Sequence, residues 1–300
     1  MRPLVAAVYN LSQQLWPRWG RRSPAATTIC QVKSQAAAVV AAAVFALTAA
    51  WVTAPPAPAA EPVLPPPAAA PDYQLGAPYP APAGVSVVAR DRSAPPAGAY
   101  AICYVNGFQT QPGELGAWPD EVLLRGTDGE LVHDPDWPDE VLLDTRTPEQ
   151  RAAITAVVSP WITGCAESGY QAVEFDNLDT YTRSAGVLRR DDALALAAQF
   201  VAAAHGAGLA AAQKNAVEDA PALRAAGFDF AVTEECAAYR ECSAVTAVYG
   251  AAVVDVEYTD NLPRPFGAMC ADPETPASVV LRDRDLVAPS TSGYHFSLCP

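Results

Sequence analysis

The sequence is poor in positive charge. Its 300 residues contain 19 Lys and Arg against 33 Asp and Glu, for a formal net charge of −14 and a pI near 4.5. The basic residues form no cluster beyond the pairs Arg21–Arg22 and Arg189–Arg190. Because proteins bind nucleic acids through clustered Lys and Arg, we expect no nucleic-acid partner.

Several short motifs of catalysis and metal binding are also absent. The sequence has no G-x-S-x-G, H-E-x-x-H, P-loop or C-x-x-C motif, and its three histidines, His133, His205 and His295, lie far apart. A serine hydrolase, a zinc protease and a nucleotidase therefore lack local support, and we expect neither a metal site nor a cofactor. The segment 206–211 fits the dinucleotide-binding motif G-x-G-x-x-A. That motif follows a strand and opens a helix, whereas this segment follows a helical pattern, so we interpret it as a helix stop.

Acidic residues are missing from the first 60 positions, where the pattern is that of an export signal. Basic residues precede an uncharged run at 36–52, and small residues follow at 57–60. This order predicts a signal peptide cleaved near Ala60, and hence a secreted protein with no membrane association. The alternative is an uncleaved membrane anchor at 36–52, since 17 residues approach the length of a spanning helix.

Proline is concentrated after this leader. Eleven of the 28 residues at 55–82 are Pro, which predicts an extended tether rather than a packed element. We therefore divide the chain into a leader at 1–60, a Pro- and Ala-rich linker at 61–71 and a single folded domain at 72–300. We expect this domain to be monomeric.

Six cysteines remain once Cys30 of the leader is set aside. An even number of Cys in an exported chain predicts disulfides rather than a metal site. Fifteen pairings are possible. The short spacing favours Cys236–Cys242 and the position near the chain end favours Cys270–Cys299, which leaves Cys103 with Cys165.

Short apolar runs alternate with helical patterns through the folded domain. The runs lie at 85–89, 100–105, 141–143, 172–175, 209–212, 228–232 and 252–256. Helix starts are marked by Thr147 before Pro-Glu-Gln and by Asp191–Asp192, and a third helical pattern ends before Gly227. Seven or eight strand–helix repeats over this length predict an α/β protein with a (β/α)8 TIM barrel.

Polar residues follow the apolar runs, at the end of the strands where a barrel carries its active site. Glu174 and Asp176 alternate with apolar residues, so they point the same way, with Asp176 nearer the mouth. Glu234 follows another run. Two carboxyl groups on different strand ends are what a glycoside hydrolase uses, one as proton donor and one as nucleophile or stabiliser. Any single acid there is also compatible with a helix cap, so the interpretation depends on their common location.

Five segments carry these strand-end residues in order. They are ICYVNGFQTQP from Ile102, VEFDNLD from Val173, AHGAGLAAAQKN from Ala204, GFDFAVTEECAAYREC from Gly227 and VVDVEYTD from Val253. Together they resemble the ordered motifs of the endo-α-1,4-polygalactosaminidase-like glycoside hydrolase family, from about residue 72 to 299. The resemblance implies a secreted TIM barrel that hydrolyses α-1,4-linked galactosamine polymers, with Asp176 and Glu234 as catalytic residues. The expected substrate-binding residues are Asn106, Glu174, Asn177, Lys214, Asn215, Glu235, Glu257 and Tyr258.

We expect a two-carboxylate reaction in which Asp176 is the nucleophile and Glu234 the acid/base, although the two roles can be exchanged. The negative charge of the chain suits a cationic amino-sugar polymer as substrate. Two alternatives stay open, because barrels host many functions. One is a non-catalytic sugar-binding protein of the cell wall on the same barrel. The other is a metal-dependent esterase or deacetylase.

Overall fold

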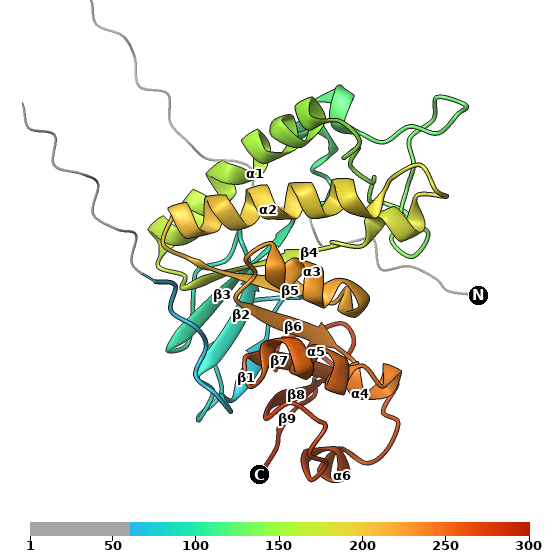
Figure 1. The fold of residues 1–300 in the computed structure, drawn as a ribbon. Helices are drawn as coiled ribbons and strands as arrows, with labels where there is room; N and C mark the ends of the chain where they lie inside the picture. Colours follow the sequence, from blue (N-terminus) through green and yellow to red (C-terminus); the bar gives the residue numbers. More distant parts are fainter. Residues whose placement is uncertain (1–60) are drawn as a thin grey trace, which may run out of the picture. The chain divides into compact units, whose positions relative to one another are not determined.

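The computed structural model describes residues 61–300, whose centre is a sheet rolled into a barrel (Figure 1). Its nine strands follow one another in chain order. They are β1 (Pro71–Tyr73), β2 (Val87–Asp91), β3 (Tyr100–Asn106), β4 (Ala172–Asp176), β5 (Ala210–Lys214), β6 (Phe230–Glu234), β7 (Val253–Tyr258), β8 (Ser278–Arg282) and β9 (Phe296–Leu298). Strands β1 to β8 are parallel, and β9 pairs antiparallel with β8. The expected α/β fold of the TIM-barrel type is confirmed.

Helices follow strands β3 to β7. They are α1 (Pro148–Ser168), α2 (Arg190–Gly206), α3 (Ala220–Ala225), α4 (Cys236–Tyr239), α5 (Cys242–Tyr249) and α6 (Phe266–Cys270), with short 3-10 turns at 115–117, 120–122, 180–183 and 217–219. In Figure 1, α1 and α2 lie side by side across one flank of the sheet. The links from β1 to β2 and from β2 to β3 are loops, so the barrel is covered unevenly.

The start of α1 follows the signal in the sequence. Thr147 Oγ1 accepts a hydrogen bond from Gln150 N, and Gln150 Oε1 accepts one from Thr147 N, both at 3.2 Å. This reciprocal capping satisfies two backbone donors that an open helix end leaves free. The helix ends at Gly169, whose φ of 95° is left-handed and suits glycine.

Alternation along the strands separates two cores. Phe175 of β4 faces outward and stacks on Phe200 of α2, with ring centroids 5.2 Å apart. Inward residues such as Ile102, Phe230 and Val256 fill the barrel itself. The inward residues nearer the carboxyl ends of the strands are polar. The apolar interior therefore ends below this open end of the barrel, its mouth, which is lined by a layer of polar and charged side chains.

Side chains complete the barrel between β1 and β8. Among the described strands, the backbone ladder runs from β1 to β9 without pairing β1 to β8. Arg282 of β8 donates a hydrogen bond to Asp72 Oδ1 of β1 at 2.7 Å and another to the carbonyl of Tyr73. Both members of the Arg282–Asp72 ion pair are fully buried, so this contact closes the barrel in place of the missing ladder.

Three expectations about the elements were wrong. The run at 141–143 is no barrel strand, because it forms antiparallel bridges to residues 109, 123 and 133 within a long insertion between β3 and α1. Strands β1 and β8 were not expected, β1 because it is short and lies in a Pro-rich stretch. The linker at 61–71 is not detached over its whole length, since Pro65 and Ala69 are buried and Pro71 already begins β1.

The disulfides are those favoured by the spacing. Cys103 pairs with Cys165, Cys236 with Cys242 and Cys270 with Cys299. Within residues 61–300, none of the helices has the length and apolar character needed to cross a membrane. The signal peptide and the alternative anchor at 36–52 lie outside the described residues.

Candidate active site

The mouth of the barrel brings together inward residues from the ends of β4 to β7. Glu174 and Asp176 come from β4, Lys214 from β5, Glu234 from β6 and Tyr258 from β7. Each is the last or third-last residue of its strand, and a period of two puts all of them on the inner face. The structure therefore brings these five expected site residues together at one end of the barrel.

Lys214 lies at the centre of the three carboxyl groups. Its Nζ is 2.9 Å from Glu234 Oε2, 3.7 Å from Glu174 Oε1 and 3.8 Å from Asp176 Oδ2. Burial lowers the pKa of Lys214, but the three acids raise it by more, so its pKa is above the ordinary value and the ammonium stays charged. One buried cation thus offsets three negative groups.

Glu174 is the deepest of the three acids. It is fully buried, Oε1 accepts a 2.6 Å hydrogen bond from the Tyr73 hydroxyl, and Oε2 has no partner among the described residues. Burial raises the pKa of Glu174 to about 7, against the opposing effect of Lys214. With no exposed surface, Glu174 is suited to support the site from below rather than to touch a substrate.

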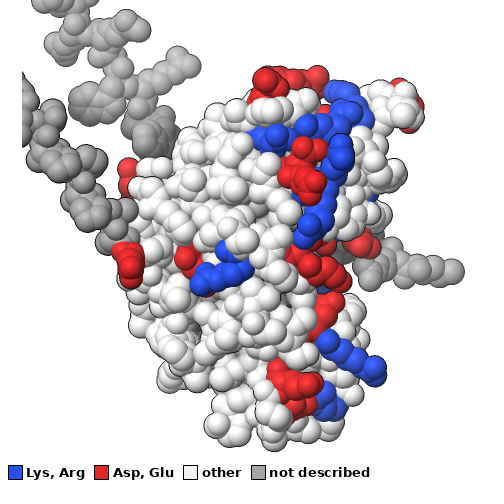
Figure 2. All heavy atoms as spheres, in the orientation of Figure 1, with Lys and Arg blue, Asp and Glu red and all other residues white. Residues whose placement is uncertain are grey.

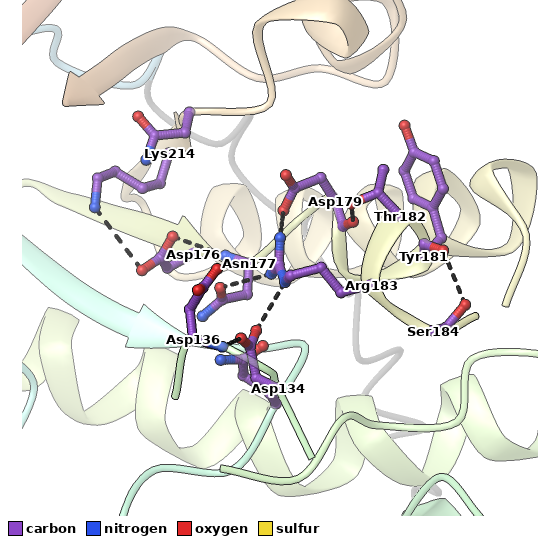
Figure 3. A network of polar contacts seen from close by, with 12 residues as sticks. Asp134, Asp136, Asp176, Asn177, Asp179, Tyr181, Thr182, Arg183, Ser184 and Lys214 are labelled. Atoms are coloured by element: carbon purple, nitrogen blue, oxygen red, sulfur yellow. Dashed lines mark hydrogen bonds and ion pairs between the residues drawn. The ribbon is translucent and has the colours of Figure 1, made fainter. Parts of the chain in front are cut away.

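Asp176 keeps some contact with solvent, with 18% of its side chain exposed. Its Oδ2 accepts a 2.7 Å hydrogen bond from the Tyr104 hydroxyl, and Oδ1 accepts one at 2.8 Å from the backbone of Asn177. Asn177 has a left-handed φ of 65°, and its side-chain oxygen accepts a 3.0 Å bond from Arg183 (Figure 3). The Asn177 side chain therefore fixes the turn whose N–H group holds Asp176.

Glu234 is the second partly exposed acid, with 27% of its side chain exposed. The Tyr258 hydroxyl donates to its Oε1, and Asn215 Nδ2 donates to its Oε2 at 3.3 Å. Asn215 also accepts a 2.8 Å bond from the backbone of Glu234. Burial raises the pKa of Glu234, but Lys214 and these donors outweigh burial and bring its pKa below the ordinary value.

Asn106 and Glu235 lie near the mouth but bind protein groups. Asn106, 2% exposed at the end of β3, donates to Glu140 Oε2 at 3.1 Å. Glu235 has a left-handed φ of 62°, and both of its carboxylate oxygens accept 2.8 Å bonds from Arg284. The Arg284 guanidinium in turn lies 4.2 Å from the centre of the Tyr258 ring.

Glu257 is not brought into the site. It precedes Tyr258 on β7, so it points to the outer face, where its Oε1 accepts a 2.7 Å bond from the backbone of Ala237. Burial raises the pKa of both Glu257 and the neighbouring Asp255. Ligand atoms of these two acids and of Cys236 and Cys242 lie within 4.8 Å of one another, but the two sulfurs are joined in a disulfide and are not free thiolates.

Some residues of the site carried no signal in the sequence. Tyr73 lies within the Pro-rich stretch, Glu140 lies in a loop, Arg183 ends the 3-10 turn at 180–183, and Arg284 follows a strand that was not expected. Only the tertiary contacts connect them to the strand ends. In Figure 2, the charged side chains in view gather along the edge where α2 begins and the strands end, while the surface over α1 and α2 is mostly uncharged.

Solved structures of other proteins have a similar fold. The crystal structure of Aspergillus fumigatus Ega3 in complex with galactosamine is similar, with a TM-score of 0.64 at 19% identity over 79% of this chain and 97% of that chain. A variant of the glycoside hydrolase domain of PelA from Pseudomonas aeruginosa gives a TM-score of 0.51 at 17% identity, over 74% and 98% of the two chains. No protein of curated function matches in sequence.

These structural likenesses show a common fold. The sequence itself goes further, because the model of the glycoside-hydrolase family GH114 matches residues 52–299 and so includes every strand of the barrel and every residue of the mouth. Many glycoside hydrolases carry a pair of carboxyl groups at the active site, and two partly exposed carboxyl groups lie at the carboxyl-end face of this barrel. The chain belongs to glycoside-hydrolase family GH114 and is a glycoside hydrolase.

Proposed function

We propose that this glycoside hydrolase cleaves α-1,4-linked galactosamine-type polysaccharide by a two-carboxylate mechanism with Asp176 and Glu234. The galactosamine bound to the structurally similar Ega3 supports the sugar class. The chain's net charge of −14 supports a cationic polymer, since opposite charges raise the rate of encounter.

A single observation supports the choice of these two acids. Asp176 and Glu234 lie 3.8 and 2.9 Å from Lys214 Nζ, and both keep exposed surface, whereas Glu174 has none. A carboxyl group that attacks or protonates a substrate has to reach it, so exposure separates the two reacting groups from the supporting one.

The same distances bear on the stereochemistry. Asp176 Oδ2 and Glu234 Oε2 lie 3.8 and 2.9 Å from the same nitrogen, so these two oxygens cannot be farther apart than the sum of the two distances. This limit includes the roughly 5–5.5 Å of retaining enzymes and reaches only the lower end of the roughly 6.5–9.5 Å of inverting ones, so we propose a retaining reaction. Asp176 then attacks the anomeric carbon while Glu234 protonates the leaving oxygen; because the pKa of Glu234 is lowered, this acid role predicts that activity is highest at acidic pH, where Glu234 carries its proton. In the second step Glu234 takes a proton from water, and the resulting hydroxide equivalent releases the sugar from Asp176.

Export fits this function, because an exported enzyme can reach a polysaccharide outside the cell. Three disulfides within residues 61–300 support an oxidising compartment for the mature protein. N-terminal sequencing of the protein from the culture medium tests cleavage near Ala60. A chain recovered with residues 36–52 in the membrane fraction would favour the anchor instead.

The activity test uses deacetylated and N-acetylated galactosamine polymers and follows the release of reducing ends. Wild-type protein should release oligomers, and Asp176→Asn and Glu234→Gln should each lower kcat by roughly 10²–10⁴-fold. The control is Glu149→Gln, an exposed acid on the first turn of α1 with the same change of charge. No release from either polymer by the wild-type protein would refute the proposed substrate, and full activity of either variant would refute the proposed carboxylate pair.

A further inference from the structure

Glu140 is a buried carboxyl group at the mouth that the two-carboxylate mechanism does not use. It lies in the insertion between β3 and α1 and is 9% exposed. Its Oε2 accepts hydrogen bonds from Asn106 Nδ2 at 3.1 Å and Gln109 Nε2 at 2.6 Å. Its Oε1 accepts none from the described residues and is not among the fully enclosed atoms that lack a partner, so this oxygen faces solvent.

The charge of Glu140 is not balanced by the protein. Among the ion pairs of residues 61–300, none includes Glu140. Burial raises its pKa to about 7, although the bond from Gln109 opposes this, and the nearby charges of Asp176 and Asp134 raise it further. A buried carboxylate without a cation is costly, and such groups in a cleft are candidates for ligand binding.

Glu140 is held close to the catalytic strand. Asn106, which binds it, sits opposite Asp176 in the ladder between β3 and β4. The turn that carries Glu140 is closed by a 3.0 Å bond from Asp134 N to the carbonyl of Glu140.

Arg183 joins this turn to the segment after β4. It donates to Asp134 Oδ2 at 2.7 Å, to Asp179 Oδ1 at 2.8 Å and to the Asn177 side chain (Figure 3). Since Asn177 also binds Asp176, one guanidinium fixes both Asp176 and the turn of Glu140. Arg183 therefore links the turn that carries Glu140 to the turn whose backbone binds Asp176.

We propose that Glu140 determines specificity by binding the ammonium group of a deacetylated hexosamine unit next to Asp176. The inference rests on the proposed function and identifies a residue that recognises the substrate of the enzyme. The amide donors occupy Oε2 and leave Oε1 free for the ammonium, which supplies the cation that the protein lacks. An N-acetylated unit is uncharged at this position and forms no such ion pair.

The test measures binding to the full chain in an Asp176→Asn background, in which hydrolysis is suppressed. The probes are a galactosamine oligosaccharide and its N-acetylated counterpart, titrated by calorimetry. The variant Glu140→Gln keeps an oxygen for Asn106 and Gln109 but removes the charge. Its control is Glu130→Gln, an exposed acid of the same insertion with the same change of charge.

We expect Glu140→Gln to weaken binding of the galactosamine oligosaccharide by roughly 10- to 100-fold and Glu130→Gln to leave it unchanged. Binding of the N-acetylated probe should stay within about twofold in both variants. Equal losses on both probes would make Glu140 a structural residue, and no loss on either would place the ammonium elsewhere; both results overturn the proposal. If the Asp176→Asn protein with an intact Glu140 binds neither probe, the proposed substrate class itself is wrong.

Discussion

Lys214 Nζ lies 2.9 Å from Glu234 Oε2, in a contact between β5 and β6. The same ammonium lies near Glu174 and Asp176 of β4, so it links the acid of β6 to the two acids of β4. Burying the ammonium group of a lysine lowers the stability of the fold unless nearby acids pair with its charge. Here three acids do so, and Lys214 in turn favours the ionised forms of Glu174 and Glu234.

Replacing Lys214 by Met should destabilise the protein in a pH-dependent way. At neutral pH the buried acids lose their cation, and the free energy of unfolding should fall by about 3–5 kcal/mol. Without the cation, burial raises the pKa of Glu174 in the folded state further above that of the unfolded chain. A group with a raised folded pKa destabilises the fold as the pH rises through that pKa, so the loss should be smaller at pH 4 than at pH 7.5. Urea unfolding at both pH values measures this, and equal losses at the two would show that the ion pairs are not responsible.

The hydroxyl of Tyr258 should set the pH at which Glu234 can donate a proton. Its hydrogen bond helps to lower the pKa of Glu234, so Tyr258→Phe should raise that pKa. If Glu234 is the acid, the alkaline limb of the kcat/KM profile moves to higher pH.

Tyr104→Phe is the matched control, because the Tyr104 hydroxyl binds Asp176 rather than Glu234. It should leave the alkaline limb in place. Movement of the acidic limb in Tyr258→Phe would instead identify Glu234 as the nucleophile and exchange the two roles.

The closure between β1 and β8 should be sensitive to single changes at Arg282 and Asp72. Arg282→Met leaves a fully buried Asp72 without its cation, and we expect a loss of about 3–5 kcal/mol in the free energy of unfolding. The double variant Asp72→Asn with Arg282→Met removes both charges and should cost less than the two single losses together. Additive losses in denaturant unfolding would show that the pair is not coupled.

The three disulfides should contribute unequally to stability. The Cys103–Cys165 bridge joins residues 62 positions apart in the sequence, and the Cys236–Cys242 bridge joins residues only 6 positions apart. Loop-closure entropy then predicts that removing the first pair, as Cys→Ala, costs about 4 kcal/mol and removing the second about 2 kcal/mol. Thermal or denaturant unfolding of the two double variants gives the order. A larger loss for the short loop would show that local packing around Cys236, rather than chain entropy, dominates.

Local patterns in the sequence were enough to predict most of the barrel. Thr147 with Gln150 marked the start of α1, the alternation of Glu174 and Asp176 gave their shared direction, and the cysteine spacings favoured the observed pairs. These predictions succeeded because a helix cap, a strand period and a short loop depend on residues close together in the chain.

The same alternation shows where an expectation was inconsistent. Glu257 and Tyr258 are consecutive strand residues, so they cannot both face the barrel interior, and the structure turns Glu257 outward against Ala237. The role of Glu235 likewise depends on Arg284, which is 49 positions away and follows a strand that the sequence did not reveal.

The sequence by itself therefore determined the fold class, the strand ends that carry the charged groups and the membership of a glycoside hydrolase family. The tertiary structure decided which of the acids share Lys214, which keep contact with solvent and which additional residues join them. Tyr73, Glu140 and Arg282 reach the site or its barrel through contacts across 101, 34 and 210 positions. Contacts over such separations depend on how the whole sheet curves and closes, and no local pattern of residues encodes that curvature.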